Sequence, residues 1–108
     1  MNRAFCVLVL LGAAGCGGAP PRDHAAEGKA ALEREDCEMA ERCYTLAIEA
    51  KPADPEAWLG RARARIGLGQ YRDAVKDATE AMRLDPAGKD APYVRTTAVM
   101  GLDRQPRP

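Results

Sequence analysis

The chain has few of the residues that build β-sheets and few of those that build catalytic centres. Aromatic residues make up 5% of the sequence, and His24 is the only histidine. A single histidine excludes a multi-histidine metal site, and we identify no histidine-based catalytic triad around it. Alanine is abundant and β-branched residues are few, which favours helix over sheet. We therefore expect an all-α protein that is not an enzyme and binds no cofactor.

The chain also lacks an excess of charge of either sign. It carries 16 acidic and 16 basic residues, so nothing draws it as a whole towards nucleic acid. Arg61, Arg63 and Arg65 alternate along one predicted helix and spread around it, so they do not form a nucleic-acid groove. Residues 22–54 hold more acids than bases and residues 55–108 the reverse. This asymmetry permits weak head-to-tail self-association, or it reflects only solvated helix faces.

Outside residues 4–14 there is no long apolar run. This stretch follows a basic start and precedes small residues, as in a secretory signal, and it is shorter than the roughly 20 residues that span a bilayer. Ala13-Ala14-Gly15-Cys16 resembles the bacterial lipobox, although leucine is usual where Ala13 stands. The resemblance implies cleavage before Cys16, a lipid on Cys16 and a periplasm-facing membrane anchor in the cell envelope. With Gly17 next, it implies the outer membrane in a cell that has two. Ordinary signal cleavage at the same bond is the alternative.

The remainder of the chain repeats itself at an offset of 34 residues. Residues 21–54 align without a gap on residues 55–88. The identical pairs are Pro21/Pro55, Ala30/Ala64, Ala40/Ala74, Thr45/Thr79, Ala47/Ala81, Pro52/Pro86 and Ala53/Ala87. A period of this length indicates a solenoid of stacked supersecondary units.

These units resemble the tetratricopeptide repeat, a pair of antiparallel helices with an early aromatic residue, close-contact alanines and a closing proline. The residues that carry the resemblance in the second unit are Trp58, Ala62, Tyr71, Ala74, Ala81 and Pro86, and in the first unit Gly28, Ala40, Tyr44, Ala47 and Pro52. Arg61 and Arg65 depart from it, because the family usually has apolar or aromatic residues there. We expect the two arginines to weaken the packing between helices.

Turn and cap residues predict five helices, at about 23–34, 37–50, 55–67, 71–84 and 91–101. Asp54-Pro55 supplies a cap and an N-terminal proline, and Gly67-Leu68-Gly69-Gln70 supplies a tight turn. Glu35-Asp36 occupies the same turn in the first unit without a glycine, so we expect a looser turn. The predicted organisation is a signal peptide (1–15), a lipidated cysteine and linker (16–21), a repeat domain (22–103) with a capping helix at 90–101, and a flexible tail (104–108).

Family resemblance implies that the first helices of the units line a concave groove for a peptide or helix of a partner protein. Alignment places seven residues on this inner face: Lys29, Leu32, Leu59, Arg63, Ile66, Tyr93 and Thr97. Basic groups beside aliphatic ones suit a segment that carries a carboxylate. One alternative is a periplasmic thiol-dependent or metal-binding protein that uses Cys37, Cys43 and His24, although their spacing matches no common zinc motif. The other is a structural repeat protein that self-associates through the open edge of its first unit.

Overall fold

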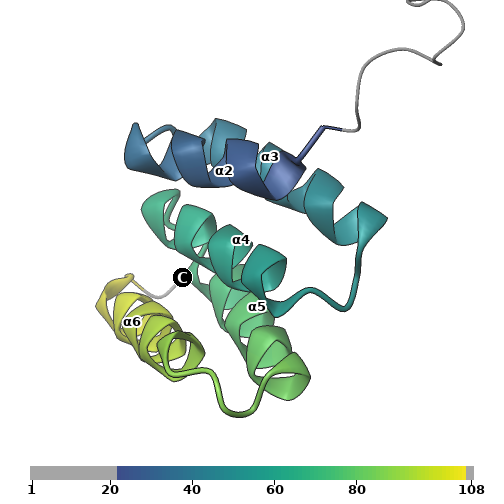
Figure 1. The fold of residues 1–108 in the computed structure, drawn as a ribbon. Helices are drawn as coiled ribbons and strands as arrows, with labels where there is room; N and C mark the ends of the chain where they lie inside the picture. The colour runs from purple at the N-terminus through teal and green to yellow at the C-terminus, as the bar shows by residue number, and fades with distance from the viewer. Residues whose placement is uncertain (1–21, 107–108) are drawn as a thin grey trace, which may run out of the picture.

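The computed structural model describes residues 22–106, which form five helices and no strand. The helices are α2 (His24–Glu33), α3 (Cys37–Ala50), α4 (Pro55–Gly67), α5 (Tyr71–Leu84) and α6 (Asp90–Arg104). Each helix packs antiparallel to the one before it, in a stack of two helical pairs and one further helix (Figure 1). The predicted all-α helical repeat is therefore confirmed. The last helix runs to Arg104 and not to Gly101, so the first residue of the predicted tail is helical.

Aspartates start three of the five helices. The side chains of Asp23, Asp36 and Asp54 each accept a hydrogen bond from a backbone N–H in the first turn of the helix that follows. Pro55 occupies the first turn of α4, where its missing N–H costs nothing. The start of α6 differs, because Asp90 lies inside the helix and no side chain caps it.

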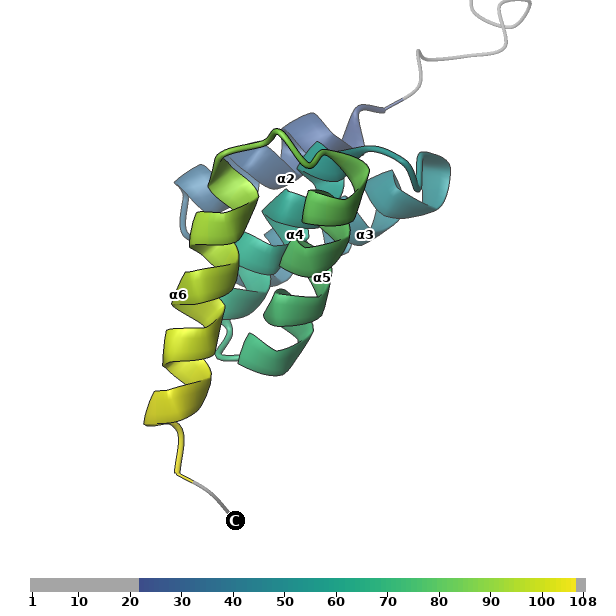
Figure 2. The same ribbon diagram turned by 90° about the horizontal axis from the view of Figure 1, so that it is seen from below.

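The first helices of the units lie on one side of the stack and the second helices on the other (Figure 2). Helix α4 contacts both α2 and α6, whereas no Cα atom of α3 comes within 8 Å of one in α5. The stack is therefore closed on the side of α2, α4 and α6 and open between α3 and α5. We name the closed side the first-helix face.

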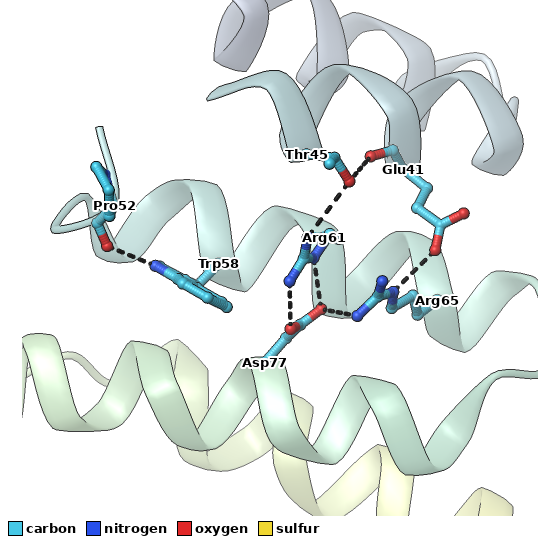
Figure 3. Close-up of polar contacts among 7 residues, drawn as sticks. All are labelled: Glu41, Thr45, Pro52, Trp58, Arg61, Arg65 and Asp77. Carbon is cyan, nitrogen blue, oxygen red and sulfur yellow. Dashed lines mark hydrogen bonds and ion pairs between the residues drawn. The ribbon is translucent and has the colours of Figure 1, made fainter. Parts of the chain in front are cut away.

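The opening between α3 and α5 is filled by long side chains of α4 (Figure 3). The Arg61 guanidinium binds Asp77 of α5 through two hydrogen bonds, from Nε and Nη2, each 2.9 Å long. Arg65 binds the same carboxylate through Nη1 at 2.9 Å and reaches Glu41 of α3 through Nε at 2.8 Å. Asp77 is only 2% exposed, and it is buried without an unpaired charge because two arginines reach it.

Neighbouring side chains complete this network. Arg61 Nη1 donates to the Thr45 hydroxyl at 3.3 Å, and the Arg61 guanidinium lies over the Trp58 ring, 5.1 Å from its centre. Burial acts to lower the pKa of Arg65, but the hydrogen bond to Glu41 and the charge of Asp77 outweigh it, so that pKa is raised. The expectation that Arg61 and Arg65 weaken the packing is wrong, since the two residues join α3, α4 and α5.

Large and small residues occupy opposite places at equivalent positions of the two units. The Tyr44 ring lies between two glycines, because a Cβ atom on Gly60 would stand 2.2 Å from its Cζ and one on Gly28 3.0 Å from the same atom. One repeat later these three positions hold Ala78, Val94 and Ala62. A large residue between two glycines is thus replaced by a small residue between two larger ones, which keeps the interior filled in both units.

The turn between α2 and α3 is equivalent to the turn between α4 and α5, despite their different residues. Asp36 N donates to Ala31 O, and Gln70 N donates to Arg65 O, both at 2.8 Å. Glu35 has φ +60° and Gly69 has φ +79°, so both turns place a left-handed residue at the same point. The looser first turn that the sequence predicted is therefore wrong. The first turn makes its closing hydrogen bonds although Glu35 must adopt the left-handed backbone conformation, which is unfavourable for residues other than glycine.

Replacing Glu35 with glycine should stabilise the protein. The left-handed strain at a non-glycine residue exceeds the entropy that a glycine adds to the unfolded chain, so we expect Glu35→Gly to raise the free energy of unfolding by about 0.5–1 kcal/mol. Gly69→Ala should lower it by a similar amount, because Gly69 already provides the favoured residue. Urea unfolding followed by circular dichroism measures both. A destabilised Glu35→Gly variant would contradict the assignment of strain to Glu35.

Removing the charge of Asp77 should lower the free energy of unfolding far more than removing an exposed charge. Asp77→Asn removes the carboxylate that two largely buried guanidinium groups share, and we expect a loss of about 3 kcal/mol of unfolding free energy. Arg63→Leu, on the same helix but outside the network, should change it by less than about 0.5 kcal/mol. The triple variant Arg61→Leu/Arg65→Leu/Asp77→Ala should recover most of the loss, because it removes all three buried charges together. If the triple variant lost as much unfolding free energy as Asp77→Asn, the charges themselves would be needed for stability.

Candidate protein-interaction surface

Side chains from equivalent positions form rows across the first-helix face. Because α2, α4 and α6 lie next to one another, residues that are one repeat apart become neighbours in space. One row contains Lys29, Arg63 and Thr97, and beside it run the rows Ala25, Leu59, Tyr93 and Leu32, Ile66, Met100. All seven residues predicted to bind a partner therefore belong to three adjoining rows.

Accessibility divides the seven predicted residues into three groups. Lys29, Arg63, Tyr93 and Thr97 are exposed, Tyr93 to 75% of its surface. Leu32 and Ile66 are half-buried and form apolar floor between the helices. Leu59 is only 5% exposed within the core that α4, α5 and α6 share. Leu59 is therefore withdrawn from the expected contact set, because its side chain packs inward.

The two basic residues of the central row are available to a ligand. Arg63 Nη2 lies 3.4 Å from Asp90 Oδ2, with 45% and 72% of the two side chains exposed. An ion pair at that distance and exposure contributes little, and an incoming carboxylate can replace it. Lys29 is exposed at the equivalent position of α2, so both units present a cation in the same row.

Sequence reasoning named Tyr44 only as a residue of the repeat pattern and missed its position beneath this face. Tyr44 belongs to α3, and its ring passes between Gly28 of α2 and Gly60 of α4, so its hydroxyl end lies between the two first helices. Burial raises the pKa of Tyr44 above its ordinary value, and the charge of Arg63 opposes that rise. The hydroxyl therefore stays protonated at neutral pH as a possible donor. A tyrosine together with glycines in the two neighbouring first helices was the available signal.

Two hollows lie at equivalent ends of the units. One has a volume of about 380 Å³ at the N-terminus of α2, and its lining includes Ala25, Ala47 and Lys51. The other has about 160 Å³ at the N-termini of α4 and α6, and its lining includes Leu59, Ala81 and Asp85, one repeat later. The first is larger partly because Ala25 stands where Leu59 fills the second. Each could receive a single side chain of a bound segment.

The structure does not bring together the three residues of the metal-binding alternative. Cys37 and Cys43 are free thiols in one helix, with Cys43 buried and Cys37 half-buried against Gly67. His24 lies at the other end of the first unit, near Ala47 and Ala50, and pairs with Glu27 at 3.1 Å. Across residues 22–106 no group of three potential ligands is close enough to hold a metal ion.

The predicted signal peptide and Cys16 fall outside the described residues, so lipidation of Cys16 stays a prediction. Of the helices within residues 22–106, none has both the length and the apolar character that crossing a membrane requires.

Comparison with known proteins supports the repeat. Residues 55–87 match the tetratricopeptide repeat family model. A protein SGT1 homolog from Oryza sativa is 46% identical over 76 residues, which are 70% of this chain and 20% of the relative. The co-chaperone sgt12 of Aspergillus fumigatus is 35% identical over 78 residues, 72% of this chain and 21% of the relative. The chain thus spans about a fifth of the length of these relatives.

A solved structure agrees with the fold. A chain from a study of how the UNC-45 chaperone binds and folds muscle myosin superposes with a TM-score of 0.70 at 35% identity. The match covers 74% of this chain and 9% of the other.

These relatives correct the predicted localisation. The relatives from Oryza sativa, Saccharomyces cerevisiae and Aspergillus fumigatus are eukaryotic proteins, and the last of them is named as a heat-shock cognate co-chaperone. The lipid-anchored location in a bacterial envelope, inferred from the N-terminus, is contradicted by them. The relatives and the repeat-equivalent geometry instead agree on the module itself, which is similar to the tetratricopeptide repeat and matches that family over residues 55–87.

Proposed function

We propose that this chain is a protein-interaction module, not an enzyme, and that it binds a segment of another protein along the first-helix face. The observation that carries the proposal is the row of Lys29 and Arg63, two exposed cations at equivalent positions of adjacent helices. Half-buried Leu32 and Ile66 form the adjoining row on one side, and the row on the other side ends at the exposed Tyr93 ring of α6. A cation next to apolar surface, repeated at fixed spacing, suits a segment that alternates carboxylate and apolar side chains.

The rigid part of the surface supports this proposal. Tyr44 and the glycines beside it are buried, and the network around Asp77 holds α4 against α3 and α5. The first helices therefore keep their spacing when a ligand arrives, and little conformational entropy is lost in forming the site. Similarity to proteins named as co-chaperones is consistent with binding to a polypeptide.

The ligand of this surface should be acidic and only partly apolar. Peptides selected from a random phage-displayed library on the purified protein should be enriched in Asp and Glu. Fluorescence polarisation of the selected peptides should show affinity reduced about tenfold or more by Lys29→Glu/Arg63→Glu, since charge-assisted hydrogen bonds contribute about 1.5–3 kcal/mol. Affinity should also fall as salt is raised.

The chain provides a matched control for this experiment. Arg42 and Lys76 are likewise exposed bases at positions one repeat apart, but they lie on the second helices α3 and α5. Arg42→Glu/Lys76→Glu makes the same change in net charge and should leave peptide affinity unchanged. Equal losses in the two double variants would attribute binding to overall charge and would reject the first-helix face as the site.

A further inference from the structure

One face of α6 is the repeat counterpart of the face of α4 that α5 covers. Pro92, Arg95 and Val99 follow Trp58, Arg61 and Arg65 by one repeat. On α4, Arg61 and Arg65 are largely buried against α5, with 14% and 20% of their side chains exposed. On α6 the equivalent residues are open, and Val99 is 39% exposed. Helix α6 contacts only α4 and α5 among the described helices and forms one edge of the stack (Figure 2).

A hollow of about 240 Å³ lies on this open face. Met82 of α5 and Pro92, Arg95, Thr96 and Val99 of α6 line it. It therefore has an apolar floor with one guanidinium group beside it. Within residues 22–106, Arg95 forms no ion pair. We name these five residues the α6 edge site.

The internal repeat indicates what kind of element fits there. On α4 the equivalent face receives a helix, α5, that presents a stripe of buried alanines (Ala74, Ala78 and Ala81) and one carboxylate, Asp77. Asp77 binds Arg61, whose counterpart on α6 is Arg95. Val99 stands on α6 where α4 has Arg65. A helix on α6 therefore meets one cation where α5 meets two, and it gains one apolar contact.

We propose that the α6 edge site binds an amphipathic helix of a partner protein, which presents small apolar residues to Met82 and Val99 and a carboxylate to Arg95. The occupant is assigned to a partner and not to a second copy of this chain, because the chain's own helix of that pattern, α5, already has its alanine stripe buried. The site lies beside the first-helix face and does not depend on it.

The structure supplies a probe for this site, the sequence of α5 itself. A peptide of residues 70–85, stapled across the exposed positions of Arg72 and Lys76 to hold it helical, is titrated into the isotope-labelled full chain. Amide chemical shifts should change at Met82, Arg95, Thr96 and Val99. Arg95→Asp should weaken binding about tenfold or more, whereas the control Arg42→Asp should leave it unchanged.

A charge exchange separates a specific pair from general attraction. The peptide with Asp77→Arg should bind wild-type protein weakly and should bind the Arg95→Asp variant with restored affinity. No shift change at the four edge residues, changes confined to the first-helix face, or absence of recovery in the exchanged pair would each overturn the proposal. Sedimentation of the chain alone provides another test, because self-association that Arg95→Asp abolishes would assign the site to a second copy.

The outcome is independent of the proposed function. Lys29→Glu/Arg63→Glu should leave binding of the α5 peptide intact, since those residues lie outside the α6 edge site. Loss of peptide binding in that double variant would place the probe on the first-helix face and would contradict the edge site alone.

Discussion

Asp77 is the residue through which three helices are joined, and the shape of the array depends on it. Its carboxylate receives both Arg61 and Arg65, and Arg65 extends to Glu41. These long side chains fill the opening between α3 and α5, where the backbones do not meet. With the second helices held apart, α2, α4 and α6 come together, and the rows of the first-helix face follow from that closure. A network of this kind fixes one arrangement more than it adds stability, because burying three charges is costly.

In the interior, a compensating change of side-chain volume between the two units keeps the first helices at the same spacing. Tyr44 occupies the room left by Gly28 and Gly60, while one repeat later Ala78 faces Ala62 and Val94. Two units with different side chains therefore present their first helices at a common spacing. This common spacing is what allows Lys29 and Arg63 to act as one surface and makes α5 a template for an element that could cover α6.

The backbone was largely predictable from the sequence because its signals are local. Asp54-Pro55, the closing prolines and the gapless offset determine where helices begin and end. The side-chain network was not predictable, because Arg61 and Asp77 are 16 residues apart. Considered singly in the sequence, each residue has the pattern of an exposed charge on a helix. Leu59 illustrates the same limit within the site, since its row is exposed at Tyr93 and buried one repeat earlier. The Glu35 turn was misjudged because the closing hydrogen bonds outweigh the strain of one left-handed residue.

The most direct test of the central claim is to observe where a bound segment lies. Intermolecular nuclear Overhauser effects between a selected acidic peptide and the labelled protein report contacts atom by atom. The account predicts contacts to the side chains of Lys29, Arg63 and Thr97 and to the Tyr93 ring, all on the first-helix face. Contacts confined to the outward-facing residues of α3 and α5, with none to α2, α4 or α6, would contradict it.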